Sequence, residues 1–127
     1  MDRPVDFKQI IPQFVVPDVV RAAEFYRDKL GFEILGYFLD PPVYAMVRRG
    51  PVEIHFGKSD GDEVRTNRSS RKGIGSDAYI FVSDVRALFD ELSHAGVEII
   101  EGPVEREYDC TEVVVKDCFG FVLVFAD

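Results

Sequence analysis

Apolar residues are dense over residues 8–16, KQIIPQFVV, and this run predicts a β-strand that ends at Pro17. The next apolar residues recur at helical spacing, at Val19, Ala22, Ala23, Phe25, Tyr26 and Leu30. Asp18 suits the N-cap of that helix, and Gly31 suits the left-handed residue just after its end. The pattern therefore predicts a strand followed by a helix over 19–30.

Three short strands are predicted after this helix, because Pro-Pro and Gly-Pro pairs separate the segments FEILGYFLD, PVYAMVRRG and PVEIHFG. Residues 58–76 then carry almost no apolar side chains but include Arg65, Arg68, Arg71 and Lys72. A polar segment of this length in a small domain is typical of a lid or a linker. We expect it to close over a ligand, or to be a solvated loop.

The pattern then starts again. DAYIFVS predicts a strand, Asp84 a helix N-cap, and Gly96 the end of a helix whose apolar stripe is Val85, Leu88, Phe89 and Leu92. VEIIEG, VEREYD, TEVVVKD and FGFVLVFA predict the strands that follow. The sequence thus predicts an α+β fold of two tandem β-α-β-β-β modules, about 8–57 and 77–126, whose curled mixed sheets surround a cupped cleft.

Composition fits one globular domain over residues 1–127, with 46% hydrophobic and 30% charged residues. The longest apolar runs are only a few residues, and the start, MDRPVDFKQ, does not resemble a secretory signal, so we expect a cytoplasmic protein. A net charge of −8 disfavours nucleic acid and anionic membranes as partners. Cys110 and Cys118 are expected to be free thiols.

Four segments resemble the signature segments of the vicinal oxygen chelate superfamily, which includes glyoxalase I, extradiol dioxygenases and bleomycin-resistance proteins. They are PQFVVPDVVRAAEFYRDKLGFEI, YAMVRRGPVEIHFG, YIFVSDVRALFDELSHAGVEI and VVVKDCFGFVLVFAD. The resemblance covers nearly all of the chain and implies the same two-module fold. It does not choose a chemistry, because that superfamily hosts several.

Metal-using members of the superfamily place metal ligands at positions that correspond here to Ile11, Asp77 and Val124. Isoleucine and valine cannot donate a lone pair to a cation. The remaining candidates, Glu53 and His55, are two residues apart, so both point to the same face of a strand. The resemblance therefore implies the metal-free branch typified by bleomycin-resistance proteins, with no cofactor and no catalytic residue. A weak metal site at His55, Glu53 and Asp77 remains the fallback.

Bleomycin-resistance proteins sequester a bulky cationic glycopeptide in a groove between two subunits. The resemblance implies the same here: a homodimer that binds a bulky cationic or aromatic small molecule and confers antibiotic resistance. The expected ligand-binding residues are Glu53, His55, Asp77, Tyr44, Phe56, Tyr79, Tyr108, Phe38 and Phe119. The expected core aromatic residues are Phe25, Tyr26, Phe81, Phe89, Phe121 and Phe125.

Two other functions stay open at this point. One is a divergent glyoxalase-like metal-dependent lyase, isomerase, transferase or dioxygenase that uses His55 with Glu53 or Asp77. The other is a protein-interaction module whose cup is filled by side chains. His55 itself is open to three interpretations: a satisfied strand histidine, a ligand contact or a general base.

Overall fold

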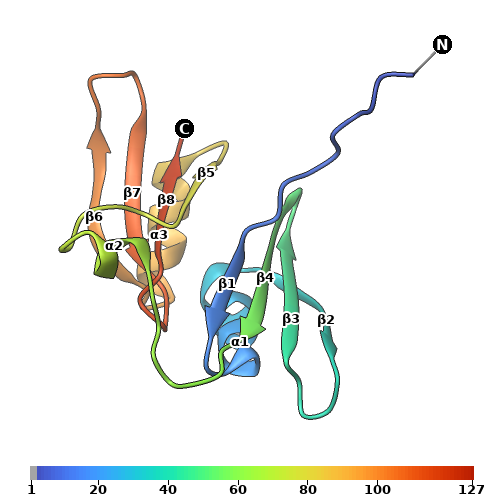
Figure 1. Cartoon of the computed structure of the whole chain (residues 1–127). Coiled ribbons are helices and arrows are strands. Elements are labelled where there is room, and N and C mark those ends of the chain that lie inside the picture. Colours follow the sequence, from blue (N-terminus) through green and yellow to red (C-terminus); the bar gives the residue numbers. More distant parts are fainter. Residues whose placement is uncertain (1–2) are drawn as a thin grey trace.

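Residues 3–127 are described by the computed structural model and form two β-α-β-β-β modules in tandem (Figure 1). The first contains β1 (Gln13–Val16), α1 (Val19–Leu30), β2 (Glu33–Phe38), β3 (Tyr44–Arg49) and β4 (Val52–Lys58). The second contains β5 (Ala78–Phe81), α3 (Val85–His94), β6 (Glu98–Glu105), β7 (Thr111–Lys116) and β8 (Val122–Ala126). A one-turn helix, α2 (Asn67–Ser70), lies between them. The predicted α+β class is confirmed.

Both long helices begin at the predicted aspartates. The side chain of Asp18 accepts a hydrogen bond from the backbone N–H of Arg21, and that of Asp84 accepts one from Ala87, each at 3.0 Å. Gly31 follows α1 with φ of 73°, the left-handed conformation that glycine adopts without steric cost. No helix within residues 3–127 is both long and apolar enough to cross a membrane.

Two predicted strand boundaries are wrong. Residues 8–12 lie outside β1, because pairing with β4 begins at Gln13 and the preceding Pro12 has no amide hydrogen to extend the ladder. The segments VEIIEG and VEREYD were predicted as separate strands, but most of the first and the first two residues of the second belong to the single strand β6, which pairs with β7 on both sides of Gly102. The glycine that signals a break in the sequence is an irregularity within one strand.

Each module contributes one four-stranded sheet. The strand orders are β1-β4-β3-β2 and β5-β8-β7-β6, with one parallel pair in each sheet, β1 with β4 and β5 with β8. The other neighbouring strands are antiparallel. β1 and β5 therefore occupy equivalent places in the two repeats, each at the edge of its sheet.

The helix-covered faces of both sheets share a single hydrophobic core. It includes Ile54 and Phe56 from β4 together with Leu123 and Phe125 from β8. The rings of Phe14 and Phe121 stack across the two modules, with centroids 4.4 Å apart and planes within 5° of parallel. The two modules are therefore packed against each other as one unit.

Polar contacts join the modules as well. The buried Tyr26 hydroxyl of α1 donates a 2.7 Å hydrogen bond to Asp117, between β7 and β8. At the surface, Arg49 forms an ion pair with Glu91 of α3. Because the shared core uses the helix-covered face of each sheet, the opposite faces, which we call the open faces, are left for other contacts.

Candidate ligand-binding site

The open face of the first sheet carries the sequence-predicted pair Glu53 and His55. In β4, Ile54 and Phe56 are fully buried on the core side, whereas Glu53 and His55 alternate with them and point to the other side. Their side chains are 17% and 14% exposed. The pair therefore lies within reach of a molecule that covers this face.

A three-member hydrogen-bonded chain runs across β4 and β3. Glu53 Oε2 lies 2.5 Å from His55 Nε2, and His55 Nδ1 lies 2.7 Å from the Tyr44 hydroxyl. With Glu53 ionised and the imidazole neutral, Nε2 donates to the carboxylate and Nδ1 accepts from the phenol. Glu53 thus fixes His55, and His55 fixes Tyr44, so the three polar groups hold a defined geometry.

Asp77, the third member of the fallback metal set, is occupied elsewhere. Its Oδ1 accepts from the backbone N–H of Asn67 and its Oδ2 from that of Val122, both at 2.8 Å. Asp77 therefore joins the start of α2 to the start of β8. Within residues 3–127, no three His, Cys, Asp or Glu side chains are grouped closely enough to hold a metal ion.

The second sheet has a polar centre of its own at Glu112 of β7, which is 3% exposed. Its carboxylate accepts hydrogen bonds from the hydroxyl of Tyr79, from the hydroxyl of Tyr108 at 2.7 Å, and from Arg106 Nε at 2.9 Å. Arg106 also contacts Glu101 at 2.5 Å. Tyr79 of β5 and Tyr108 and Arg106 of the β6–β7 turn thus converge on one buried carboxylate, and Glu101 of β6 contacts Arg106.

The ionisation of this centre follows from its contacts. Burial alone raises the pKa of Glu112, but the hydrogen bonds from Tyr79, Arg106 and Tyr108 outweigh it and bring that pKa below its ordinary value. The same hydrogen bond to Glu112 raises the pKa of Tyr79. At neutral pH, Glu112 is therefore a carboxylate and Tyr79 a neutral phenol.

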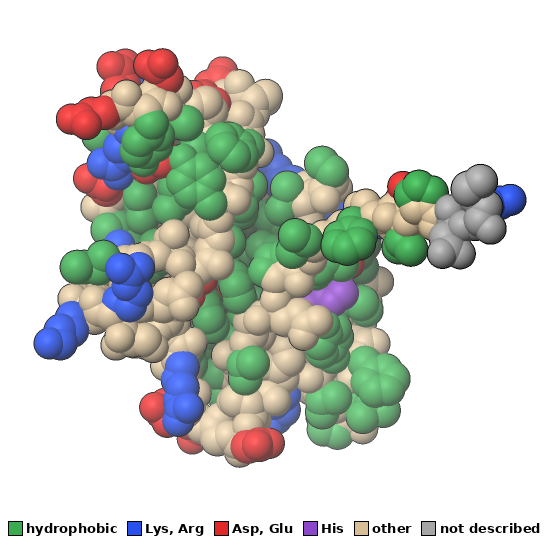
Figure 2. Space-filling view, turned by 45° about the horizontal axis from the view of Figure 1, so that its top comes forward, with side chains coloured by type: hydrophobic (Ala, Val, Ile, Leu, Met, Phe, Trp, Pro, Cys, Tyr) green, Lys and Arg blue, Asp and Glu red, His purple; other side chains and the backbone are tan. Residues whose placement is uncertain are grey.

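The rings of Tyr79 and Tyr108 are exposed to solvent, while their hydroxyls are hydrogen-bonded to Glu112. Tyr79 is 44% and Tyr108 63% exposed, and Tyr79 contacts Phe81 edge to face with centroids 5.3 Å apart. Hydrophobic side chains are visible on the face shown in Figure 2, with acidic side chains at its upper edge. Rings whose orientation is fixed lose little freedom when a planar ligand stacks on them.

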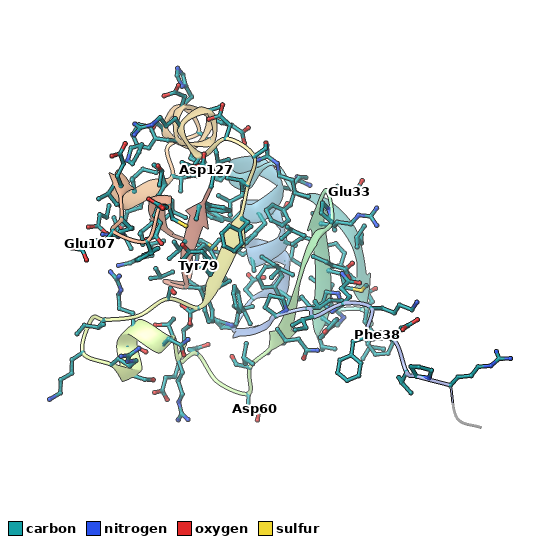
Figure 3. All side chains as sticks on the ribbon, turned by 90° about the horizontal axis from the view of Figure 1, so that it is seen from above. Glu33, Phe38, Asp60, Tyr79, Glu107 and Asp127 are labelled. Carbon is teal, nitrogen blue, oxygen red and sulfur yellow. The ribbon has the colours of Figure 1, made fainter. Side chains whose placement is uncertain are left out.

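The other predicted aromatic residues are placed differently. Phe38, at the end of β2, is 60% exposed and projects outward in Figure 3. Phe56 is fully buried between α1 and the first sheet, where it packs on Phe14 and Tyr26 and is closed to any ligand. Phe119 lies under the guanidinium of Arg21, whose Cζ is 4.9 Å from the centre of the Phe119 ring.

Phe81, expected in the core, is exposed because Ile80 takes the core side of β5.

Glu112 was missed by the sequence reasoning, although the sequence holds a signal for it. It directly precedes the three valines of β7, sequence TEVVVK, and lies on the same side of the strand as Val114. A carboxylate at a buried strand position needs hydrogen-bonding partners. Tyr79 and Tyr108, which had been singled out as aromatic surfaces, are those partners.

A cleft of about 760 Å³ lies between the modules on the side of the 58–76 segment. Its lining includes Phe14 and Phe121 and several charged residues of the linker, among them Lys58, Asp60, Glu63 and Arg65. Asp77 also lines it, with both carboxylate oxygens already bonded. The polar segment thus borders a cleft.

Comparison with known families and structures gives a consistent picture. The profile of the Glyoxalase/Bleomycin resistance protein/Dioxygenase superfamily matches residues 9–125. Among solved structures, TioX from Micromonospora sp. ML1 is similar at TM-score 0.74 and 17% identity, covering 94% of this chain and 98% of its own. UcmS2 has TM-score 0.74 and 25% identity, covering 97% and 99%.

A putative glyoxalase family protein from Bacillus anthracis has TM-score 0.71 and 20% identity, with 98% of each chain covered. No curated protein sequence matches. At these identities, TioX and the Bacillus anthracis protein show only that the fold is shared.

Proposed function

Because the chain belongs to the glyoxalase/bleomycin resistance/dioxygenase superfamily, we propose that it is a metal-free binding protein for a bulky, cationic or aromatic small molecule. Binding sequesters the molecule without transforming it, in the manner of the bleomycin-resistance branch, and in the cytoplasm this would protect against an antibiotic. The observation that carries the proposal is the pair of rigid acidic and aromatic centres on the two open faces.

Each centre contains a carboxylate and at least one tyrosine hydroxyl, and each supplies a different part of the binding surface. Glu53 with His55 and Tyr44 lies on the first sheet, and Glu112 with Tyr79 and Tyr108 on the second. Carboxylates favour a cationic ligand, and a net charge of −8 steers such a ligand toward the protein. The exposed rings of Tyr79, Tyr108 and Phe38 favour planar groups.

A homodimer would complete the site. One chain buries the helix-covered faces of both sheets in a single core, so its two open faces are free to meet those of another copy. In a two-fold dimer, the first sheet of one copy faces the second sheet of its partner, and the arrangement occurs twice. The dimer then has two equivalent grooves, each lined by one Glu53 centre and one Glu112 centre.

Titration of metal-free bleomycin into the purified chain tests this proposal. We expect saturable binding by isothermal titration calorimetry and a higher melting temperature in excess ligand. Glu112→Gln is expected to weaken binding about tenfold, since it removes the negative charge and loosens both tyrosines. Glu107→Gln, the same change at an exposed position of the β6–β7 turn, is the control.

An unchanged melting temperature at millimolar bleomycin would rule out bleomycin as the ligand. Equal weakening by Glu107→Gln and Glu112→Gln would mean that only net charge matters and that the Glu112 centre does not bind the ligand.

A metal-dependent enzyme is the second candidate, and the adjacent Glu53 and His55 side chains are the observation in its favour. It requires further ligands, from water, substrate or a second copy of the chain. In that case His55→Ala loses both bound metal and activity. An equal metal content in His55→Ala and the unaltered chain, measured by inductively coupled plasma mass spectrometry, would eliminate it.

A further inference from the structure

Three tyrosine hydroxyls on the open faces are each hydrogen-bonded to a partner inside the protein. The Tyr44 hydroxyl lies 2.7 Å from His55 Nδ1. The hydroxyls of Tyr79 and Tyr108 both bond to the same oxygen of Glu112, that of Tyr108 at 2.7 Å. A hydroxyl has one proton to donate and two lone pairs that accept. The direction of each bond therefore decides what the hydroxyl still offers to a ligand.

All three hydroxyls donate inward. The pKa of Glu112 is lowered, so at neutral pH this side chain is a carboxylate, which accepts hydrogen bonds and donates none. On the first sheet, Nε2 of the neutral His55 ring donates to Glu53, and Nδ1 is left to accept from Tyr44. Each tyrosine has thus used its only proton, and only lone pairs remain.

We propose that the open faces select ligands by their N–H groups, with the oxygens of Tyr44, Tyr79 and Tyr108 as fixed hydrogen-bond acceptors. The ligands that fit are primary amines, amidines and guanidines. Quaternary ammonium ions of equal charge, and molecules whose polar groups only accept, are disfavoured. The inference rests on the proposed function and names the functional group by which its ligand is recognised.

The carboxylate of the second sheet acts on a ligand through the tyrosines. Glu112 is 3% exposed, whereas Tyr79 is 44% and Tyr108 63% exposed, so a ligand on this face meets the tyrosines first. Of the roughly four lone-pair sites of a carboxylate, Tyr79, Tyr108 and Arg106 occupy three. Donation to a carboxylate polarises a phenol and makes its oxygen a better acceptor. The negative charge of Glu112 thereby strengthens the two acceptors that a ligand reaches.

The exposed rings alone would favour a different class of cation. Aromatic faces attract quaternary ammonium ions, which have no N–H group. Acceptors that are covered by methyl groups lose their bonds to water and gain none in return, which weakens binding. Selection by tyrosine oxygens and selection by tyrosine rings therefore predict opposite orders of affinity for ligands of equal charge.

Fluorescence titration of the full chain with two planar cationic dyes tests this order. Proflavine is an acridine with two NH₂ groups, and acridine orange is the same acridine with each NH₂ replaced by N(CH₃)₂. The methyl groups add apolar surface, so stacking alone favours acridine orange. We expect proflavine to bind at least tenfold more tightly, the scale of one hydrogen bond that involves a charged group.

Tyrosine-to-phenylalanine variants identify the acceptors, because they keep the ring and remove the oxygen. Tyr79→Phe and Tyr108→Phe are each expected to weaken proflavine binding severalfold while acridine orange binding changes little. Tyr37→Phe is the control, because Tyr37 pairs with the buried Ala45 and lies on the helix-covered side of β2. A variant that simply misfolds loses both dyes equally, so the ratio of the two dissociation constants is the diagnostic quantity.

Acridine orange binding as tightly as proflavine would overturn the inference, and so would a preference for proflavine that persists unchanged in Tyr79→Phe and Tyr108→Phe. The proposed function would survive either result, because a planar cation would still be bound. Bleomycin binding without binding of either dye would likewise overturn the inference alone. Absence of binding for both dyes and for bleomycin would refute the inference and the proposed function together.

Discussion

At the scale of single residues, Glu112 fixes more of the candidate site than any residue chosen from the sequence. One buried carboxylate orients Tyr79, Tyr108 and Arg106, and through Arg106 it reaches Glu101. A buried acceptor of this kind is stabilising only while its donors remain in place. The orientation of the exposed rings therefore depends on a side chain that a ligand need not touch.

Glu112 also makes the stability of the folded protein depend on pH, and the sign of this dependence follows from the direction of its pKa shift. Its pKa is lowered in the folded chain, so its stabilising effect is complete above the unfolded value of about 4.3 and is lost as pH falls through the folded value. Glu112→Gln should cost about 1–3 kcal/mol at pH 7. That difference should shrink below pH 4. Urea denaturation at both pH values measures it.

Glu107→Gln serves as the control for this prediction, because Glu107 is an exposed residue of the β6–β7 turn. If the stability gap between Glu112→Gln and the unaltered chain were constant from pH 7 to pH 3, the carboxylate would not be ionised in the folded chain.

The residue scale is where sequence reasoning was least complete. The pairing of Glu53 with His55 on one face follows from their spacing, because side chains two apart on a strand point the same way. The hydrogen bonds of Asp77 to Asn67 and Val122 could not be predicted, since they depend on where the linker returns to β8. Phe56 was expected at the ligand but faces α1, because its neighbour His55 takes the open face.

At the scale of elements, the β6–β7 hairpin depends on a glycine inside a strand. Gly102 has φ of 104°, a conformation that other residues rarely adopt. A Cβ at this position would also run into the backbone of β7 at the carbonyl oxygen of Glu112. Gly102 therefore lets β6 approach β7 at the residue on which the polar centre is built.

Gly102→Ala is consequently expected to destabilise the fold by at least about 2 kcal/mol, through backbone strain and the displaced strand. Gly61→Ala, where an added Cβ meets nothing within 4 Å, is the matched control and should change stability by less than about 0.5 kcal/mol. Chemical denaturation measures both. A Gly102→Ala variant as stable as Gly61→Ala would show that β6 can move away from β7 without cost.

The helices were well predicted from the sequence, because local residues determine where they begin. Asp18 and Asp84 begin helices because their carboxylates accept from backbone N–H groups three residues on. The extent of β1 was not predicted, because a strand ends where its neighbour stops pairing, and that neighbour, β4, lies some 40 residues along the chain. The residues of β1 alone do not indicate where β4 stops pairing with them.

At the scale of the whole molecule, duplication explains both the core and the candidate site. Each module covers one face of its sheet with a helix, and the two covered faces meet in one core tied by the stacked pair Phe14 and Phe121 and by Tyr26 with Asp117. What remains are two open faces, one with Glu53, His55 and Tyr44 and the other with Glu112, Tyr79 and Tyr108. The central claim is that these faces bind a small molecule without a metal ion.

The most direct test is calorimetric titration of metal-free bleomycin into protein dialysed against a chelator, with metal content measured on the same sample. The account predicts far less than one ion per chain together with one ligand bound per chain, at a dissociation constant of about 1 µM or below. Loss of binding on chelation and its return with an added divalent ion would contradict it, and so would one divalent ion per chain that survives dialysis.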